Sequence, residues 1–232
     1  MSTSWNELAG FEYLQFDPEY ETADVPLVIC LHGRGADASD LAHLASDLPP
    51  GYRWIWPNAP HPVPFPDGST GWAWYSMGPR AEPFAEEERA AAVIEIRDRL
   101  GDFVDQLLER LHARRDRTIL MGFSQGASLC LHLGLAAPER FAAIISMSGF
   151  LPAPETLRGV GAGPPQSMLV IHGTYDRVLP ISMARDTKQW LEGAGFSPRY
   201  VEISMDHQIS YESLSVVREY LLEVLPPPAG QS

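Results

Sequence analysis

Cysteine is scarce in this chain, with only two among 232 residues. Cys30 and Cys130 both lie inside apolar runs, PLVICL and ASLCLHL. A small fold held together by disulfides is therefore not supported, and we expect two buried free thiols.

Positive charge is also scarce. The chain has 17 Lys and Arg residues against 30 Asp and Glu residues, a formal net charge of −13. Such an acidic surface repels phosphate backbones and anionic lipids, so nucleic-acid binding and stable membrane association are not expected. No apolar run reaches the length of a membrane span, and the N-terminal segment lacks the basic start and apolar stretch of a signal peptide. These absences predict a soluble, cytoplasmic protein.

Metal-binding patterns are missing as well. The seven histidines show no H-x-x-x-H pair with acidic residues nearby, a spacing that is typical of zinc sites. We therefore expect no metal and no other cofactor.

The sequence does contain short apolar runs that alternate with amphipathic segments. The runs are mostly continuously apolar, which is typical of strands buried on both faces of a parallel sheet. Strands are expected at 11–16, 26–31, 52–57, 118–123, 142–148, 167–173 and 199–204. Helices are expected at 38–46, 86–112, 124–136, 182–193 and 210–224. This order predicts an α/β fold with a mostly parallel central sheet and helices on both faces.

The alternation continues without a linker, so we predict a single domain over residues 1–225 and a flexible tail at 226–232. Two irregular stretches interrupt it, at 57–84 and at 149–166. Long structured loops in compact domains tend to be functional. The aromatic residues of the first stretch either line a site or pin the loop to the sheet, and both interpretations stay open.

A serine in a glycine-flanked turn is the first candidate for chemistry. Gly122, Ser124 and Gly126 form a G-x-S-x-G pattern between an expected strand and an expected helix. This arrangement lifts a serine hydroxyl above the edge of a sheet, and the glycines leave room where the turn crowds the backbone. The alternative is a structural turn in which the serine caps the helix. We favour a nucleophile.

A nucleophilic serine needs a base to take its proton, and an acid to orient the base. In folds with this serine turn, the acid and then the histidine follow the serine along the chain. His132 has no carboxylate between it and the serine, and His172 lies inside an expected strand. His207 follows the last expected strand and is the predicted base.

Three aspartates lie between the serine and His207. Asp186 lies in an expected helix, where a solvated position is the default. Asp206 is the immediate neighbour of His207, so the two side chains should diverge. Asp176 lies in a loop just past an expected strand, from which a carboxylate can reach a neighbouring loop. Asp176 is the predicted acid, and a merely turn-forming aspartate is the alternative.

A glycine-containing turn, LHGRGAD, directly follows the expected strand at 26–31. In this type of fold the turn supplies one backbone N–H to the oxyanion, and the residue after the nucleophile supplies the second. Here these are the N–H groups of Arg34 and Gln125. The Arg34 side chain either steers an acidic substrate or sits in solvent, and we favour solvent.

The combined motifs resemble the phospholipase/carboxylesterase family of small α/β hydrolases, which includes acyl-protein thioesterases and bacterial carboxylesterases. The matching pieces are LHGRGADASD, the WYS of GWAWYSM, GFSQGA, MSGFLP, HGTYDRVLP and MDHQIS. The resemblance implies an α/β-hydrolase fold with a triad of Ser124, Asp176 and His207 and an oxyanion hole at Arg34 and Gln125. It also implies an acyl pocket in the region of Trp72, Trp74 and Tyr75.

Three positions depart from the family pattern. The family often has Leu where this chain has Arg34, Asp where it has Ser76, and Gly where it has Asp206. None of these replaces a triad side chain, so the mechanism should survive, and acyl preference is what they put in question.

The predicted function is that of a serine hydrolase that cleaves small-molecule carboxylic esters through an acyl-enzyme. Short loops leave little room for a large cap domain, so we expect an open, shallow pocket that suits short or medium acyl chains. A lysophospholipase or an acyl-protein thioesterase is an alternative within the enzymes. A non-catalytic binder of a small hydrophobic ligand is an alternative of another class. The oligomeric state stays open, with a homodimer as one candidate.

Overall fold

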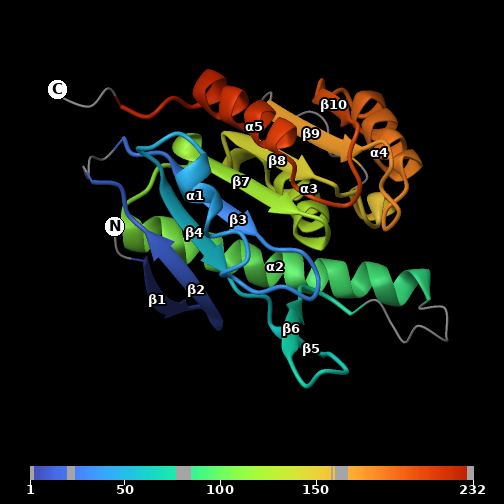
Figure 1. The fold of residues 1–232 in the computed structure, drawn as a ribbon, viewed down its shortest axis with the longest axis horizontal. Coiled ribbons are helices and arrows are strands. Elements are labelled where there is room, and N and C mark those ends of the chain that lie inside the picture. Colours follow the sequence, from blue (N-terminus) through green and yellow to red (C-terminus); the bar gives the residue numbers. More distant parts are fainter. Residues whose placement is uncertain (1–2, 20–23, 77–84, 158, 160–166, 229–232) are drawn as a thin grey trace.

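The computed structural model describes residues 3–19, 24–76, 85–157, 159 and 167–228. Its centre is an eight-stranded sheet in the order β1-β2-β4-β3-β7-β8-β9-β10 (Figure 1). All neighbours from β4 to β10 run parallel, whereas β1 and β2 are antiparallel at one edge. The expected α/β fold with a mostly parallel sheet is confirmed.

The strands of the large sheet are β1 Thr3–Leu8, β2 Phe11–Phe16, β3 Leu27–Leu31, β4 Arg53–Pro57, β7 Thr118–Phe123, β8 Ala143–Met147, β9 Ser167–Gly173 and β10 Arg199–Ile203. Each of the seven expected strands is present, with ends that differ by at most one residue. The sequence missed β1, because this edge strand is largely exposed and carries no apolar run. It also missed a separate hairpin of β5 His61–Pro64 and β6 Thr70–Ala73, since prolines in β5 mask the strand pattern.

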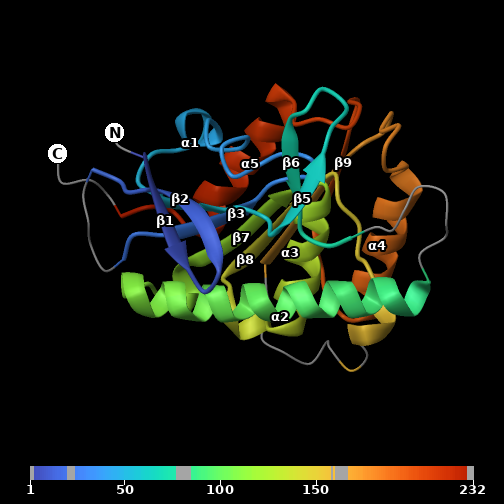
Figure 2. The same cartoon turned by 90° about the horizontal axis from the view of Figure 1, so that it is seen from below.

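The main helices are α1 Leu44–Asp47, α2 Glu86–Leu111, α3 Gln125–Ala136, α4 Ile181–Gly193 and α5 Tyr211–Val224, with short 3₁₀ turns at Arg115–Arg117, Pro138–Arg140 and Pro154–Leu157. Helices α2, α3 and α4 cover one face of the sheet, and α1 and α5 cover the other (Figure 2). Each face has its own apolar core, which explains why the central strands are apolar on both sides. No cap domain interrupts the described part of the chain.

The helix expected at 38–46 is wrong in extent, because only Leu44–Asp47 is helical. Side-chain acceptors take the amides that a longer helix would need. The Asp37 carboxylate accepts the backbone N–H of Ser39 at 2.8 Å and its hydroxyl at 2.5 Å, while the Asn58 side chain accepts the Ala38 amide at 3.0 Å. Such local bonds compete with helix formation.

The start of the tail is in contact with the rest of the molecule. The Pro226 carbonyl accepts a hydrogen bond from Arg117 at 3.0 Å, and Pro227 lies against Gly51. The rest of the predicted flexible tail, 229–232, lies outside the described residues, as do 77–84, 158 and 160–166 of the two irregular stretches. None of the helices described has the length and apolar composition needed to cross a membrane.

The parallel strands bring distant loops to one edge of the sheet. Because β3, β7, β9 and β10 run in the same direction, the segments that follow them meet at the carboxyl ends of the strands. This edge is where open α/β sheets bind their ligands. It carries every residue predicted from the sequence to take part in the chemistry.

Candidate active site

Ser124 lies in a strained turn between β7 and α3. Its backbone has φ 54° and ψ −119°, a left-handed conformation that is rare for a residue with a side chain. A hydrogen bond from its amide to the Met147 carbonyl, at 2.9 Å, holds this conformation. The side chain makes no capping bond to α3, so the alternative of a helix-capping serine is wrong.

Both glycines of the motif are required by close backbone contacts. A Cβ atom at Gly122 would lie 2.6 Å from the carbonyl carbon of Gly126. A Cβ atom at Gly126 would lie 2.3 Å from the carbonyl oxygen of Leu31 at the end of β3. The glycines therefore let β7, α3 and the end of β3 approach closely enough to present the serine.

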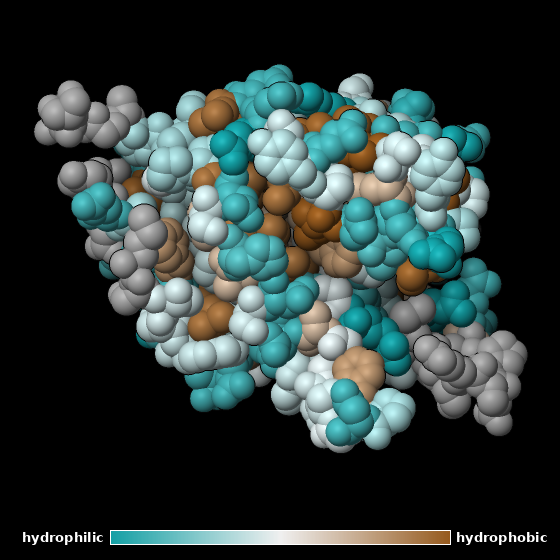
Figure 3. All heavy atoms as spheres, in the orientation of Figure 1, coloured by the Kyte–Doolittle hydropathy of each residue, from teal (hydrophilic) through white to brown (hydrophobic). Residues whose placement is uncertain are grey.

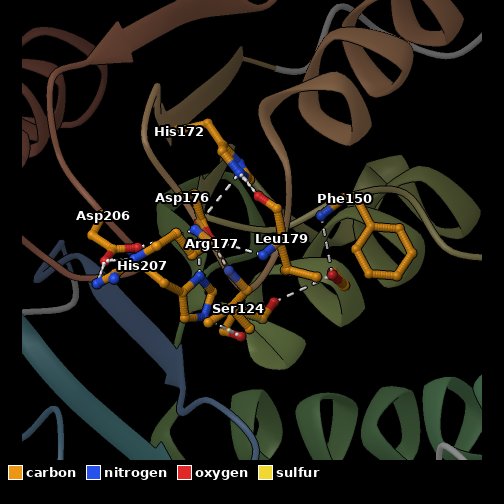
Figure 4. A network of polar contacts seen from close by, with 10 residues as sticks. Ser124, Phe150, His172, Asp176, Arg177, Leu179, Asp206 and His207 are labelled. Carbon is orange, nitrogen blue, oxygen red and sulfur yellow. Dashed lines mark hydrogen bonds and ion pairs between the residues drawn. The ribbon is translucent and has the colours of Figure 1, made fainter.

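A chain of hydrogen bonds joins Ser124 to His207 and Asp176 (Figure 4). The Nε2 atom of His207 lies 2.9 Å from Ser124 Oγ, and its Nδ1 atom lies 2.7 Å from Asp176 Oδ2. A carboxylate can only accept, so Nδ1 carries the proton and Nε2 is left to accept the serine hydroxyl. The Phe123 ring packs beside the imidazole, with centroids 4.9 Å apart. The structure thus brings together the three side chains chosen from chain order.

The Asp176 carboxylate is buried and held on both oxygens. Its Oδ1 accepts the backbone N–H groups of Val178 at 2.9 Å and Leu179 at 2.7 Å. Its Oδ2 faces His207 and also lies 3.4 Å from Nε2 of His172. His172 is fully buried and donates to the Leu179 carbonyl at 2.8 Å, so it packs behind the acid. In the sequence, the only signal for His172 was its position near the end of an expected strand, which places it at the carboxyl edge of the sheet.

The turn after β3 lies beside the serine. A Cβ atom at Gly33 would be 3.3 Å from that of Ser124. Neither the amide of Arg34 nor that of Gln125 donates a hydrogen bond to another described residue. The Arg34 side chain is exposed and forms no hydrogen bond or ion pair within the described part of the chain, in agreement with the solvent interpretation.

The His32 side chain holds this turn in place through hydrogen bonds, a role that the sequence did not reveal. Its Nε2 accepts the Ala59 amide at 3.1 Å, so the ring proton is on Nδ1 and is donated to the Gly33 carbonyl at 2.8 Å. Burial lowers the pKa of His32, which favours this neutral form. A histidine directly after a buried strand was the available signal.

The Gln125 side chain also has a structural role that was missed. Its oxygen accepts the Trp74 amide and its nitrogen donates to the Tyr75 carbonyl, both at 2.9 Å. The indole of Trp74 donates to the His32 carbonyl at 2.8 Å. The helix that follows the serine is therefore tied to the segment after β6.

The three residues predicted to line an acyl pocket have different surroundings. Trp74 and Tyr75 are buried, whereas Trp72 is partly exposed. The backbone of Trp72 pairs with the turn after β3, accepting from Gly35 at 2.7 Å and donating to Ala36 at 2.9 Å. The acyl-pocket assignment stays a prediction, and Trp72 is the residue of the three with surface available to a ligand.

Asp206 turns away from the imidazole, as its position next to His207 suggested. Its carboxylate instead binds the side chain and amide of Arg177 and the amide of His207. The hydrogen bonds from the Arg177 side chain, followed by those from the two amides, hold the pKa of Asp206 well below its usual range. This contact between two site loops was not foreseen.

Large apolar side chains are exposed on the loops around the serine. Among the described residues, the exposed large hydrophobic side chains include Phe65 at the tip of the β5–β6 hairpin, and Tyr175 and Val178 in the loop that carries Asp176. Tyr211, also exposed, is the first residue of α5. Phe65 packs over Gly35 of the turn, and Tyr175 and Val178 flank the acid. Figure 3, in the orientation of Figure 1, shows hydrophobic residues near the middle of the visible surface, among hydrophilic ones.

The chain is similar to known proteins over most of its length. A family model described as phospholipase/carboxylesterase matches residues 19–225. Acyl-protein thioesterase 1 of Schizosaccharomyces pombe is 31% identical over 176 residues, covering 73% of this chain and 76% of the relative. A probable inactive carboxylesterase of Oryza sativa is 25% identical over 217 residues, covering 85% and 84%. The crystal structure of esterase PE8 has a TM-score of 0.81 and 30% identity, covering 97% of this chain and all of that one.

Proposed function

Because the chain belongs to the phospholipase/carboxylesterase family, we propose that Ser124, His207 and Asp176 form the catalytic triad of a serine esterase. The hydrogen-bonded path from Ser124 Oγ through the imidazole to the Asp176 carboxylate carries this proposal. The family is one of ester and thioester hydrolases, so the reaction class follows from membership. The residues that perform it are inferred from geometry.

The reaction begins when the Ser124 hydroxyl attacks the acyl carbonyl and His207 Nε2 takes its proton. The resulting oxyanion accepts hydrogen bonds from the backbone N–H groups of Arg34 and Gln125, and the loss of one such donor typically costs about 3–4 kcal/mol in the transition state. Collapse of this intermediate expels the alcohol, which receives the proton from His207, and leaves the acyl group on the serine. Water, deprotonated by His207, then releases the acid and restores the serine.

Neutral esters with an apolar acyl group are the proposed substrates. The exposed aromatic and aliphatic side chains of the site loops suit such a group, and Trp72 offers a partly exposed aromatic surface beside the turn after β3. No cap domain covers the site in the described part of the chain, which favours short or medium acyl chains. We also propose a cytoplasmic protein without stable membrane association, on the basis of the acidic charge.

A thioesterase activity is the second candidate, supported by the likeness to a protein named acyl-protein thioesterase 1. The same triad attacks oxygen esters and thioesters, so the site geometry does not separate them. A non-catalytic binder is less favoured, because a binder has no need of three side chains aligned within hydrogen-bonding distance. The likeness to a probable inactive carboxylesterase makes a direct test necessary.

The test compares wild type with Ser124→Ala on p-nitrophenyl esters from acetate to palmitate, and on an acyl thioester. We expect turnover that peaks at short or medium chains and falls by at least about 10³-fold in Ser124→Ala. A fluorophosphonate probe should label wild type and not the variant, and light scattering on the same samples reports the oligomeric state. Wild-type protein that neither hydrolyses the esters nor reacts with the probe would point to the binder.

A further inference from the structure

The acid and the base of the proposed triad come from two different loops. Asp176 follows β9 and His207 follows β10, and these strands are parallel neighbours with Gly173 paired to Ile203. The alignment of the imidazole between acid and serine therefore depends on how the two loops are held against each other.

Backbone bonds hold the two loops together where they leave the sheet. The amide of Thr174 donates to the Ile203 carbonyl at 2.8 Å, and that of Tyr175 donates to the Met205 carbonyl at 3.1 Å. The loops are so close here that a Cβ atom at Gly173 would lie 2.4 Å from the Met205 oxygen. These bonds end one residue before Asp176 and two residues before His207.

Beyond that point, apart from the Asp176–His207 hydrogen bond itself, the bonds that join the two described loops are made by the Asp206 carboxylate. Asp206 Oδ1 accepts the backbone N–H of Arg177 at 3.0 Å and that of His207 at 2.8 Å. Its Oδ2 accepts Arg177 Nε at 2.7 Å and a second guanidinium nitrogen (Figure 4). One side chain thus binds the residue after the acid and the base itself. We call this contact the Arg177–Asp206 clamp.

The clamp is a poor candidate for a stabilising element of the fold. The Arg177 side chain is 86% exposed and that of Asp206 is 32% exposed. Exposed ion pairs contribute little to the free energy of unfolding, because water and salt screen them. A contact that stabilises little but fixes the neighbours of two reactive side chains is expected to act on geometry.

We propose that Arg177 and Asp206 are positioning residues for the esterase reaction: the clamp holds the Asp176 loop against the His207 loop and keeps the imidazole aligned with Ser124. The inference rests on the proposed function. In this proposal both residues act through Asp176 and His207 and not on the substrate. Their loss should therefore lower kcat and leave KM nearly unchanged, since small misplacements of catalytic groups reduce rates strongly.

Three single variants separate the parts of the clamp. Asp206→Ala removes every bond, Asp206→Asn keeps an oxygen for the two amides, and Arg177→Ala keeps the amides but loses the guanidinium. We expect Asp206→Ala to lower kcat on a p-nitrophenyl ester about 10-fold, with KM within about two-fold of wild type. Asp206→Asn should recover most of this loss. The double variant should be no slower than Asp206→Ala, because the Arg177 guanidinium acts through Asp206.

A second arginine–carboxylate pair provides the matched control. Arg185 binds Glu202 through two hydrogen bonds of 2.8 Å and joins α4 to β10 without contacting the triad. Glu202→Gln removes a comparable ion pair, so it should leave kcat within about two-fold of wild type. Melting temperatures of all variants measure any effect on folding.

The outcomes are distinct. An active wild type with unchanged kcat in Asp206→Ala overturns the inference alone, as does a loss of kcat that Glu202→Gln reproduces. A loss in Asp206→Ala that Asp206→Asn does not relieve also contradicts it. A wild type that neither hydrolyses esters nor reacts with a fluorophosphonate overturns the proposed function, and the inference with it.

Discussion

Among single residues, the buried histidines show how one residue type is used for two purposes. His32, His132 and His172 are buried and form hydrogen bonds as structural groups, whereas His207 is only partly buried and faces the serine. Burial, helped by Arg97, lowers the pKa of His132 to about 4. A neutral buried histidine packs well. Once the pH is low enough for the unfolded chain to bind a proton that the folded chain does not, however, the free energy of unfolding falls.

Acid should therefore destabilise the protein through His132. The unfolded residue binds a proton below about pH 6.5, while the folded one stays neutral until about pH 4. Stability contributed by this residue is present at pH 7 and is lost progressively as the pH falls from 6.5 to 4, by roughly 3 kcal/mol in total. Urea unfolding of wild type and His132→Gln at pH 7 and pH 4.5 measures the difference.

His132→Gln should lose less stability between the two pH values than wild type does. Gln cannot be protonated, and it can still bond to the Thr156 hydroxyl that His132 contacts at 2.9 Å. The exposed His43 supplies the control, since His43→Gln should behave like wild type. Equal losses in wild type and His132→Gln would contradict the prediction.

At the scale of elements, the β5–β6 hairpin supports the turn after β3. Strand β6 extends its pairing to this turn through the two hydrogen bonds of Trp72. The His32 side chain also binds the Gly33 carbonyl of this turn, and Phe65 at the hairpin tip lies against Gly35. The hairpin therefore helps to keep the proposed oxyanion donor of Arg34 in place.

Gly71→Ala should disturb the proposed oxyanion site. A Cβ atom at Gly71 would lie 1.9 Å from the Gly35 carbonyl oxygen, so the strand and the turn must separate. Displacing one oxyanion donor should lower kcat by about 10²-fold. Steady-state kinetics on a p-nitrophenyl ester, together with the melting temperature, measure the effect.

Gly193→Ala is the matched control, because a Cβ atom there meets nothing within 4 Å. It should leave kcat unchanged. A folded Gly71→Ala protein with wild-type kcat would show that the hairpin does not position the turn.

At the scale of the whole molecule, exposed apolar side chains near the site are combined with a strongly acidic net charge of −13. A field of this sign slows the approach of anionic substrates and leaves neutral substrates unaffected. The Arg34 side chain, exposed beside the serine, provides a local charge of the opposite sign. The charge preference of the enzyme depends on whether the net negative charge or the Arg34 side chain has the larger effect on the substrate.

The dependence of kcat/KM on salt concentration distinguishes these two effects. We expect kcat/KM for a p-nitrophenyl ester with a free carboxylate on its acyl group to rise several-fold between low salt and about 0.5 M NaCl, because screening weakens the repulsion. The rate for p-nitrophenyl butyrate should hardly change. A fall with salt for the anionic ester, abolished in Arg34→Leu, would instead show that Arg34 steers acidic substrates.

The sequence alone determined seven of the eight strands of the large sheet, and it singled out the residues of the proposed triad. Buried parallel strands read as continuous apolar runs, and the order of serine, acid and histidine along the chain left one candidate for the base. These features are encoded locally or by order, so one sequence suffices to recognise them. The hairpin prolines and the turn at Asp37 are local exceptions, in which side chains override the expected pattern.

Only the tertiary structure decided how the site is supported. The Gln125 side chain binds Trp74 across 51 positions of the chain, and the clamp joins Arg177 to Asp206 across 29. The tautomer of His32 depends on an amide 27 residues away. Contacts between distant segments leave no period or motif in the sequence, because the backbone path alone brings the partners together. For the same reason the burial of Trp74 and Tyr75, which resemblance had placed in an acyl pocket, became evident only in the folded chain.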